Sequence, residues 1–220
     1  MVKPRSRKGV TPANAGKTYD KRFLEPWELA ALMNQCPTRS NGVRDRALIA
    51  FLYRTGVDLS EALDRKLTDL HLEPDEESVS VYGRRNRTAR TLALDEFVLR
   101  ELRPWLDMRA RFPGEHLFCT VVGDRLGARL GDNSVRSGLH RLAEAAGISE
   151  RVTPSAFRNT LAAELFTEAW PFHYLQAQLG ITMLTAFQYY IEDLGIRPPA
   201  DDEIMELMRT RPPAPGPGPP

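Results

Sequence analysis

The sequence predicts a mainly α-helical α+β domain with one small β-element. Helical patterns bounded by capping residues and glycines fill most of the chain from residue 22 onward. The period changes to two in one place only, between about residues 73 and 94. A composition of 42% hydrophobic and 27% charged residues is ordinary for a globular protein, so 220 residues suffice for one domain with a core.

The first helices are predicted from local signals at their ends. A helix begins near Pro26 in "FLEPWELAALMNQC", because proline suits the first helical turn. The segment "GVRDRALIAFLYRTG" predicts a largely buried helix closed by Gly56. A third helix is expected in "DLSEALDRKLTDL", with Ser60 as its cap.

The change of period predicts a hairpin. "SVSVYG" and "RTLAL" are the two strands, and "RRNRTA" is the turn between them. Helical patterns then return, and the remaining helices are expected over residues 95–112, 132–147, 153–169, 171–180, 183–191 and 201–209.

The two ends of the chain differ from its middle. Residues 1–21 are basic and lack periodicity, which predicts a flexible arm. Residues 22–194 form the predicted domain, residues 195–211 a tail with a short helix, and residues 212–220 a proline-rich disordered tail. No apolar run approaches 18 residues and no secretory signal is apparent at the start, so we expect no membrane span and a cytoplasmic protein.

The few cysteines and histidines show no metal-ligand spacing, so no metal and no cofactor are predicted. Cys36 and Cys119 are expected to be small core residues without a disulfide.

The net charge of +1 says nothing about partners, but the distribution of charge along the chain does. Two basic clusters favour either a phosphate-binding surface or a solvated face: Lys3, Arg5, Arg7 and Lys8, and then Arg84, Arg85, Arg87 and Arg90.

Several segments, taken in their order along the chain, resemble the catalytic domain of the tyrosine recombinase (phage integrase) family over residues 22–194. They are "RFLEPWELAALM", "GVRDRALIAFLYRTGVDLSEAL", "VYGRRNRTARTLAL", "VTPSAFRNTLAAELFTEA" and "LGITMLTAFQYYIEDL". Tyr190 follows Arg158 by 32 residues, a spacing that suits the family. The resemblance implies DNA cutting and rejoining through a tyrosine, in which cations clamp the scissile phosphate and an acid and a base move protons.

The resemblance assigns roles residue by residue. Tyr190 stands at the nucleophile, Arg158 at one half of the phosphate clamp, and Arg84 at the place of the hairpin lysine. Duplex or branched DNA is the implied partner, bound by Arg158, by the arginines of residues 84–90 and by the basic arm. The family's N-terminal clamping domain is expected to be absent, and the helix "DDEIMELM" is expected to mediate homo-oligomers.

Four positions depart from the family's pattern. Asp58 stands where the first catalytic arginine is usual, and its local explanation is that it caps a helix or pairs with Arg54. Ser155 and Ile181 stand at the two histidine positions; locally, Ser155 starts a helix and Ile181 packs. Arg84 keeps a charge but is a poor general acid, because a guanidinium hardly deprotonates.

Other assignments stay open at this point. Glu61 would support the missing arginine, so its task here is unassigned. Arg158 is either a phosphate clamp or the ion-pair partner of a buried acid such as Glu164, and Tyr190 is either the nucleophile or a packing aromatic.

The predicted function is therefore DNA binding with absent or strongly impaired strand cleavage, associated with the nucleoid when DNA is bound. The alternatives are an active recombinase that forms a 3′-phosphotyrosyl link through Tyr190, and an oligomerising scaffold with little affinity for DNA.

Overall fold

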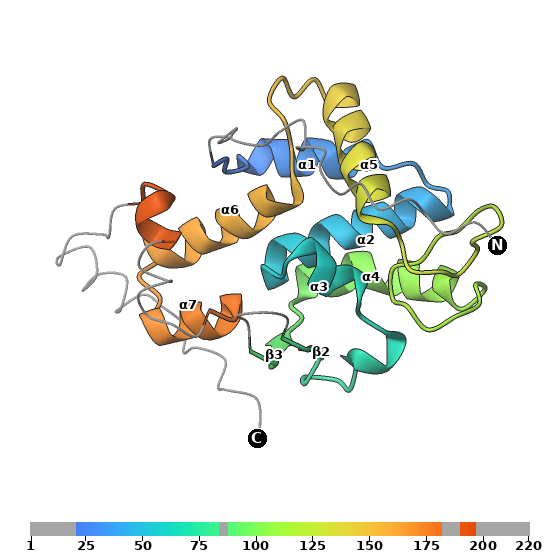
Figure 1. Ribbon diagram of the computed structural model, residues 1–220, viewed down its shortest axis with the longest axis horizontal. Helices are drawn as coiled ribbons and strands as arrows, with labels where there is room; N and C mark the ends of the chain where they lie inside the picture. Colours follow the sequence, from blue (N-terminus) through green and yellow to red (C-terminus); the bar gives the residue numbers. More distant parts are fainter. Residues whose placement is uncertain (1–20, 84–87, 182–189, 197–220) are drawn as a thin grey trace, which may run out of the picture.

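The computed structural model describes residues 21–83, 88–181 and 190–196 (Figure 1). Its elements follow in the order α1 (Pro26–Asn34), α2 (Ser40–Thr55), α3 (Leu59–Leu63), the 3₁₀ turn η1 (Leu67–Asp69), β1 (Leu70–His71), β2 (Ser78–Val81), β3 (Arg90–Ala93), α4 (Glu96–Arg109), α5 (Asp132–Ala145), α6 (Pro154–Thr167) and α7 (Phe172–Leu179). The mainly helical α+β class predicted from the sequence is confirmed.

Helix α2 lies at the centre and packs against α3, α4 and α6. Six consecutive residues, 47–52, are buried on it, as expected of a helix surrounded by others. It ends as predicted at Gly56, which has a left-handed φ of 64°. A Cβ at this glycine would also lie 2.8 Å from the Leu161 side chain of α6, so glycine allows both the turn and the close approach.

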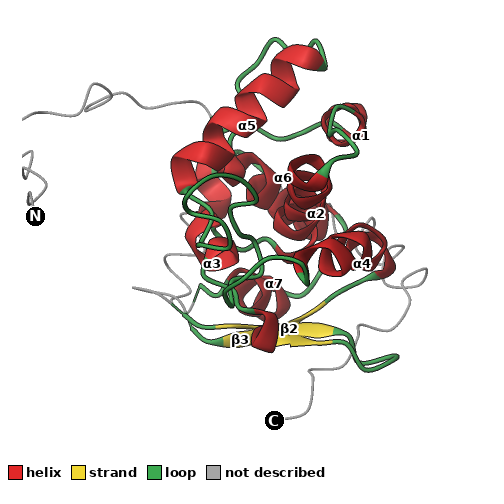
Figure 2. Ribbon diagram, turned by 90° about the vertical axis from the view of Figure 1, so that its right-hand side faces the viewer, coloured by secondary structure: helices red, strands yellow, loops and turns green. Residues whose placement is uncertain are grey.

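The sheet is antiparallel in the order β1-β2-β3, with Val79 opposite Leu92 and Val81 opposite Arg90. Figure 2 shows it along one edge of the molecule, with α7 next to β3. Val79, Val81 and Leu92 are buried. Because alternate residues of a strand face the same side, Arg90 shares the inner face with Leu92 and is directed toward the helices.

Of the two caps predicted for the third helix, Asp58 is right and Ser60 is wrong, and the helix is shorter than predicted. Asp58, rather than Ser60, precedes the first helical residue, and the helix ends at Leu63. The rest of that segment forms η1 and β1, a strand that the sequence did not predict, since two residues are too few to show alternation. Residues 190–193 are helical, whereas most of the predicted 183–191 helix and all of the 201–209 helix lie outside the described residues.

Among the described residues, the core divides into two clusters. The larger surrounds α2, and the smaller lies between α6, α7 and residues 191–194. Cys119 is buried, Cys36 is half-buried, and both are free thiols, as predicted. In the part of the chain that the structure describes, no helix is long and apolar enough to cross a bilayer.

Trp105 gives a direct test of this core. It is fully buried on α4, stacks on Phe112, and donates its indole N–H to the Leu117 carbonyl at 2.9 Å. We expect Trp105→Phe to lower the free energy of unfolding by about 2–4 kcal/mol, because it leaves a cavity and an unsatisfied buried acceptor. Trp27→Phe makes the same chemical change at a 59% exposed site and should cost under about 0.5 kcal/mol. Equal losses in urea denaturation would contradict this description of the core.

Candidate functional site

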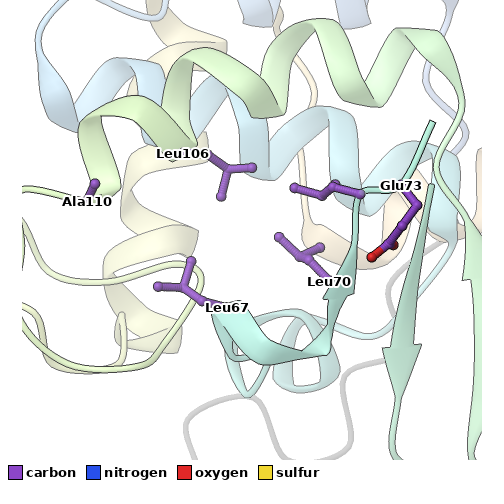
Figure 3. Close-up of a pocket in the computed structure, with 6 residues that line it drawn as sticks. Leu67, Leu70, Glu73, Leu106 and Ala110 are labelled. Carbon is purple, nitrogen blue, oxygen red and sulfur yellow. The ribbon is translucent and has the colours of Figure 1, made fainter.

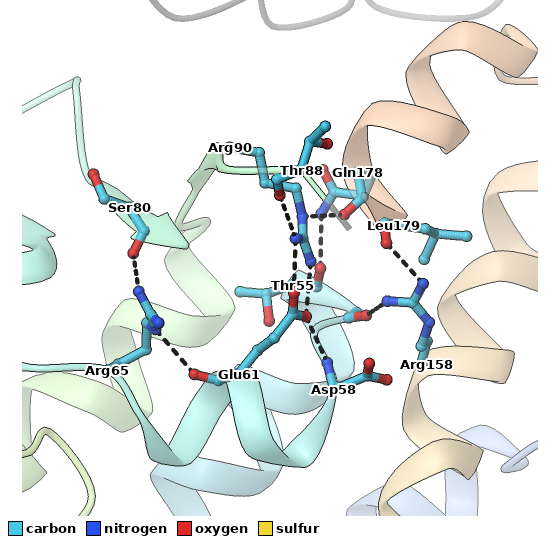
Figure 4. Close-up of polar contacts among 11 residues, drawn as sticks. Thr55, Asp58, Glu61, Arg65, Ser80, Thr88, Arg90, Arg158, Gln178 and Leu179 are labelled. Carbon is cyan, nitrogen blue, oxygen red and sulfur yellow. Dashed lines mark hydrogen bonds and ion pairs between the residues drawn. The ribbon is translucent and has the colours of Figure 1, made fainter. Parts of the chain in front are cut away.

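Arg158 ties together the ends of two helices. It lies in the first half of α6 and is only 4% exposed. Its Nη1 donates to the Gly56 carbonyl at the end of α2, and its Nη2 donates to the Leu179 carbonyl at the end of α7, at 2.7 Å (Figure 4). Both carbonyls carry the negative end of a helix dipole, so the guanidinium is bound where positive charge is favoured.

Glu61 has Arg90 as its partner, which answers the question left open by the sequence. The two side chains form a two-pronged ion pair, Nη1 to Oε1 and Nη2 to Oε2, both at 3.0 Å. Arg90 also donates from Nε to the Gln178 carbonyl at 3.1 Å and from Nη1 to the Thr88 carbonyl at 3.3 Å. The side chains are 1% and 7% exposed.

Arg90 is thus placed differently from what its membership of a basic cluster suggested. The DNA contact predicted for it stays a prediction, but the buried guanidinium favours a role in holding the structure. The sequence did contain a signal for this placement, because Arg90, Leu92 and Leu94 alternate with small residues on one strand face. Its partner Glu61 lies 29 residues earlier, so no local pattern could identify it.

Asp58 caps helix α3. Its side chain accepts from the backbone N–H three residues on, and the Glu61 side chain reaches back to accept from the Asp58 N–H at 3.0 Å. The capping explanation is confirmed, but the suggested pairing with Arg54 is wrong, since Arg54 donates to Asp95 at 2.6 Å. A carboxylate therefore occupies the place of the expected arginine, two residues after the Gly56 carbonyl that Arg158 binds.

The two histidine positions also follow their local explanations. Ser155 is exposed in the first turn of α6, with its hydroxyl 3.0 Å from that of Thr153. Ile181 is half-buried and packs against the smaller core cluster. Neither side chain carries a group that transfers protons readily at neutral pH.

Tyr190 lies against Arg158. Its hydroxyl donates to Asn159 Oδ1 at 2.9 Å, and the Arg158 guanidinium is 5.9 Å from the centre of its ring. The ammonium of Lys21 is 5.8 Å from the same centre. The structure thus brings the predicted nucleophile and the predicted clamp together. Sequence reasoning did not predict that Tyr190 contacts Asn159, the residue after Arg158, or Lys21, the last residue of the basic arm.

Glu164 is not the partner suggested for Arg158. Its carboxylate accepts a hydrogen bond from the Tyr53 hydroxyl at 2.7 Å, between α6 and α2. Burial raises the pKa of Glu164, while the Tyr53 bond acts in the opposite direction. The salt-bridge explanation of Arg158 is therefore wrong in that form.

The other predicted cations lie outside the described residues: Lys3, Arg5, Arg7, Lys8, Arg84, Arg85 and Arg87. Within the described ranges, no three His, Cys, Asp or Glu residues are placed to hold a metal ion. An open surface hollow between η1, β1 and α4 is lined by leucines, Glu73 and Ala110, and includes none of the candidate site residues (Figure 3). The candidate site is therefore the junction of α2, α3, α6, α7 and β3, with Tyr190 from helical residues 190–193 against it.

Comparison with known proteins agrees with this geometry. The model of the phage integrase family matches residues 22–194, most of the chain. The chain belongs to that family. It is 30% identical to a tyrosine recombinase XerC of Chromohalobacter salexigens over 148 residues, and 31% identical to that of Anoxybacillus flavithermus over 175 residues. These alignments cover 67% and 76% of this chain, which spans about half the length of the relatives (48% and 56%).

Solved structures share the fold. The XerA recombinase superposes with a TM-score of 0.67 at 23% identity, covering 92% of this chain and 70% of that one. XerH bound to its palindromic difH substrate, in a post-cleavage complex, gives a TM-score of 0.66 at 23% identity, covering 84% and 52%. The small sheet and the helices around α2 are therefore those of a tyrosine recombinase catalytic domain.

Glu164 provides a pH-dependent test. Because its pKa is raised in the folded state, the charged carboxylate opposes folding above that pKa, and protonation relieves the penalty as the pH falls. Glu164→Gln removes the charge and keeps an oxygen acceptor for Tyr53. We expect this variant to be more stable than the parent at pH 7 in urea denaturation, and the gain to vanish below about pH 4.

The matched control is Glu76→Gln, at an exposed carboxyl, which should change stability little at either pH. A Glu164→Gln variant that is less stable than the parent at pH 7 would show that the carboxylate contributes to folding in its charged form.

Proposed function

We propose that this chain is a DNA-binding protein of the tyrosine recombinase family in which strand cleavage is absent or strongly impaired. The observation that carries the proposal is the junction itself. Arg158 and Tyr190 lie together as a phosphate-clamping arginine and its tyrosine would, while Asp58 places a carboxylate at the start of α3, two residues after the Gly56 carbonyl that Arg158 binds. The first feature favours DNA binding, and the second opposes the chemistry.

DNA is the partner that the relatives favour. XerH is described bound to difH substrate, and a lambda integrase dimer, with a TM-score of 0.62 at 17% identity, is described bound to a core site. In this chain we assign contacts with the phosphate backbone of DNA to eight basic residues: Arg158, Arg84, Arg85, Arg87, Lys3, Arg5, Arg7 and Lys8. Phosphate contacts of this kind supply affinity without reading sequence.

Electrostatics supports the impairment. The charge on the scissile phosphate grows in the transition state, and removal of one aligned donor costs on the order of 10²–10³ in rate. Asp58 goes further, since it exchanges a cation for an anion. Ser155 and Ile181 also supply no proton-transfer group, so several rate factors are lost together.

Two other functions remain as alternatives. An active recombinase is favoured by the contact of Tyr190 with Arg158 and Asn159; there Tyr190 is the nucleophile, and Arg158 and Arg84 stabilise the charge. The two proposals differ in one observable, a covalent link between Tyr190 and DNA. A scaffold that oligomerises through the C-terminal helix would instead show little affinity for DNA.

The salt dependence of binding tests the proposal. We expect the parent chain to bind duplex or branched DNA with an affinity that falls steeply with salt. The triple variant Arg84→Ala, Arg85→Ala, Arg87→Ala should lower the magnitude of the slope of log K against log [salt] by about 2–3, one per lost phosphate contact. Fluorescence anisotropy with a labelled junction measures both quantities.

The control changes three exposed arginines on and after α4, Arg100→Ala, Arg103→Ala and Arg111→Ala, with the same loss of net charge. It should leave the slope within about one unit of the parent's. Binding that is weak or insensitive to salt would favour the scaffold over the DNA-binding protein. Equal slopes in both triple variants would contradict the contacts assigned to Arg84, Arg85 and Arg87.

A further inference from the structure

The Glu61–Arg90 pair is a buried charge pair that the proposed function does not use. A carboxylate 1% exposed would cost several kcal/mol if left unpaired, and Asp58, the residue at the start of the same helix, cannot offset its charge. Arg90 makes three further contacts: it donates hydrogen bonds to the Gln178 and Thr88 carbonyls, and it lies against Gly180. The pair therefore joins α3, β3 and the end of α7.

The contacts at the end of α7 connect Arg90 with Arg158. Arg90 binds the Gln178 carbonyl, and Arg158 binds the next one, of Leu179. The Gln178 side chain in turn donates to the Thr55 carbonyl at 3.1 Å, next to the Gly56 carbonyl that Arg158 also binds. Figure 4 shows the two guanidinium groups on either side of these helix ends. A shift of residues 178–180 would thus move an acceptor of Arg158.

Gly180 lies directly against the Arg90 guanidinium. It has a left-handed φ of 65°, and a Cβ on it would lie 2.6 Å from Arg90 Nη1 and 2.8 Å from Arg90 Cζ. Real Cβ atoms essentially never make contacts below 3.0 Å, so an alanine at this position would displace the guanidinium without changing any charge. A methyl group at position 180 is therefore a way to displace Arg90 from the end of α7.

We propose that Arg90, fixed by Glu61, is a positioning residue for Arg158: it holds residues 178–180 so that the Leu179 carbonyl orients the Arg158 guanidinium for phosphate. With Asp58 where the family has an arginine, Arg90 also supplies the cation that Glu61 requires. The inference rests on the proposed function for its DNA readout, and on the geometry of Arg158 for a readout that needs no DNA.

A merely stabilising pair predicts something different. Its loss would lower the free energy of unfolding, while the folded fraction would still bind DNA normally. A positioning pair predicts weaker binding by fully folded protein. The chain offers controls for both kinds of change: Arg46 and Glu101 form another two-pronged pair, at 2.5 and 3.2 Å, between α2 and α4, and Gly147 has a φ of 72° with nothing near its missing Cβ.

The experiment compares Arg90→Met with Arg46→Met, and Gly180→Ala with Gly147→Ala, at a temperature where every variant is folded. We expect Arg90→Met and Gly180→Ala to weaken binding to a labelled junction by about 3- to 30-fold, and the two controls to stay within about twofold. The second readout is the guanidinium N–H signal of Arg158 by NMR, assigned by its absence in Arg158→Lys. In Arg90→Met and Gly180→Ala, this signal should change its chemical shift or its protons should exchange faster with water. In the two controls it should stay as in the parent chain.

The outcomes separate this inference from the proposed function. If the parent chain shows no salt-dependent DNA binding, the proposed function fails, and the Arg158 signal still decides whether Arg90 positions it. If Arg90→Met does not fold, Gly180→Ala carries the test with all charges present. An unchanged Arg158 signal in Gly180→Ala, with DNA binding equal to that of Gly147→Ala, would overturn the positioning role.

Discussion

The structure depends on the meeting of two helix C-termini. The last carbonyls of α2 and α7 come together, and both ends carry partial negative charge without partners within their own helices. Arg158 binds one carbonyl from each end, and the Gln178 side chain joins them again one residue earlier. Left-handed glycines at 56 and 180 let both helices stop there. The predicted phosphate clamp is thus a structural connector, because the guanidinium assigned to phosphate already joins two helix ends.

Asp58, a carboxylate at the position where the family's pattern has an arginine, explains the arrangement around that connector. Asp58 and Glu61 form a capping box that defines the start of α3, and this leaves Glu61 buried with a full charge. Arg90, the first residue of strand β3, forms the ion pair with Glu61. The junction therefore holds its arginines by local contacts, whereas an efficient catalyst would have to direct the same charges at a phosphate. Binding and chemistry place different demands on these residues, and under the proposed function the arrangement around Asp58 favours binding.

Sequence reasoning predicted the parts of the fold that local patterns encode. The apolar run of α2 and its closing glycine, the hairpin strands, and the start of α6 at Pro154 all lie where the sequence placed them. The cap of α3 was encoded too, as the three-residue spacing of Asp58 and Glu61, although the sequence alone left both Ser60 and Asp58 as candidates. Strand β1 is too short to show a period. The Glu61–Arg90 and Tyr190–Asn159 contacts join distant segments, so only the folded chain could reveal them.

The central claim is that this domain binds DNA without cutting it efficiently. The most direct measurement is covalent capture: excess protein is mixed with nicked duplexes and branched junctions, binding is measured, and the mixture is then quenched with detergent, with Tyr190→Phe run in parallel. The account predicts DNA retained by both proteins before the quench and no protein–DNA band after it. A band from the parent chain that disappears in Tyr190→Phe would contradict the account and identify an active recombinase with an unusual set of catalytic residues.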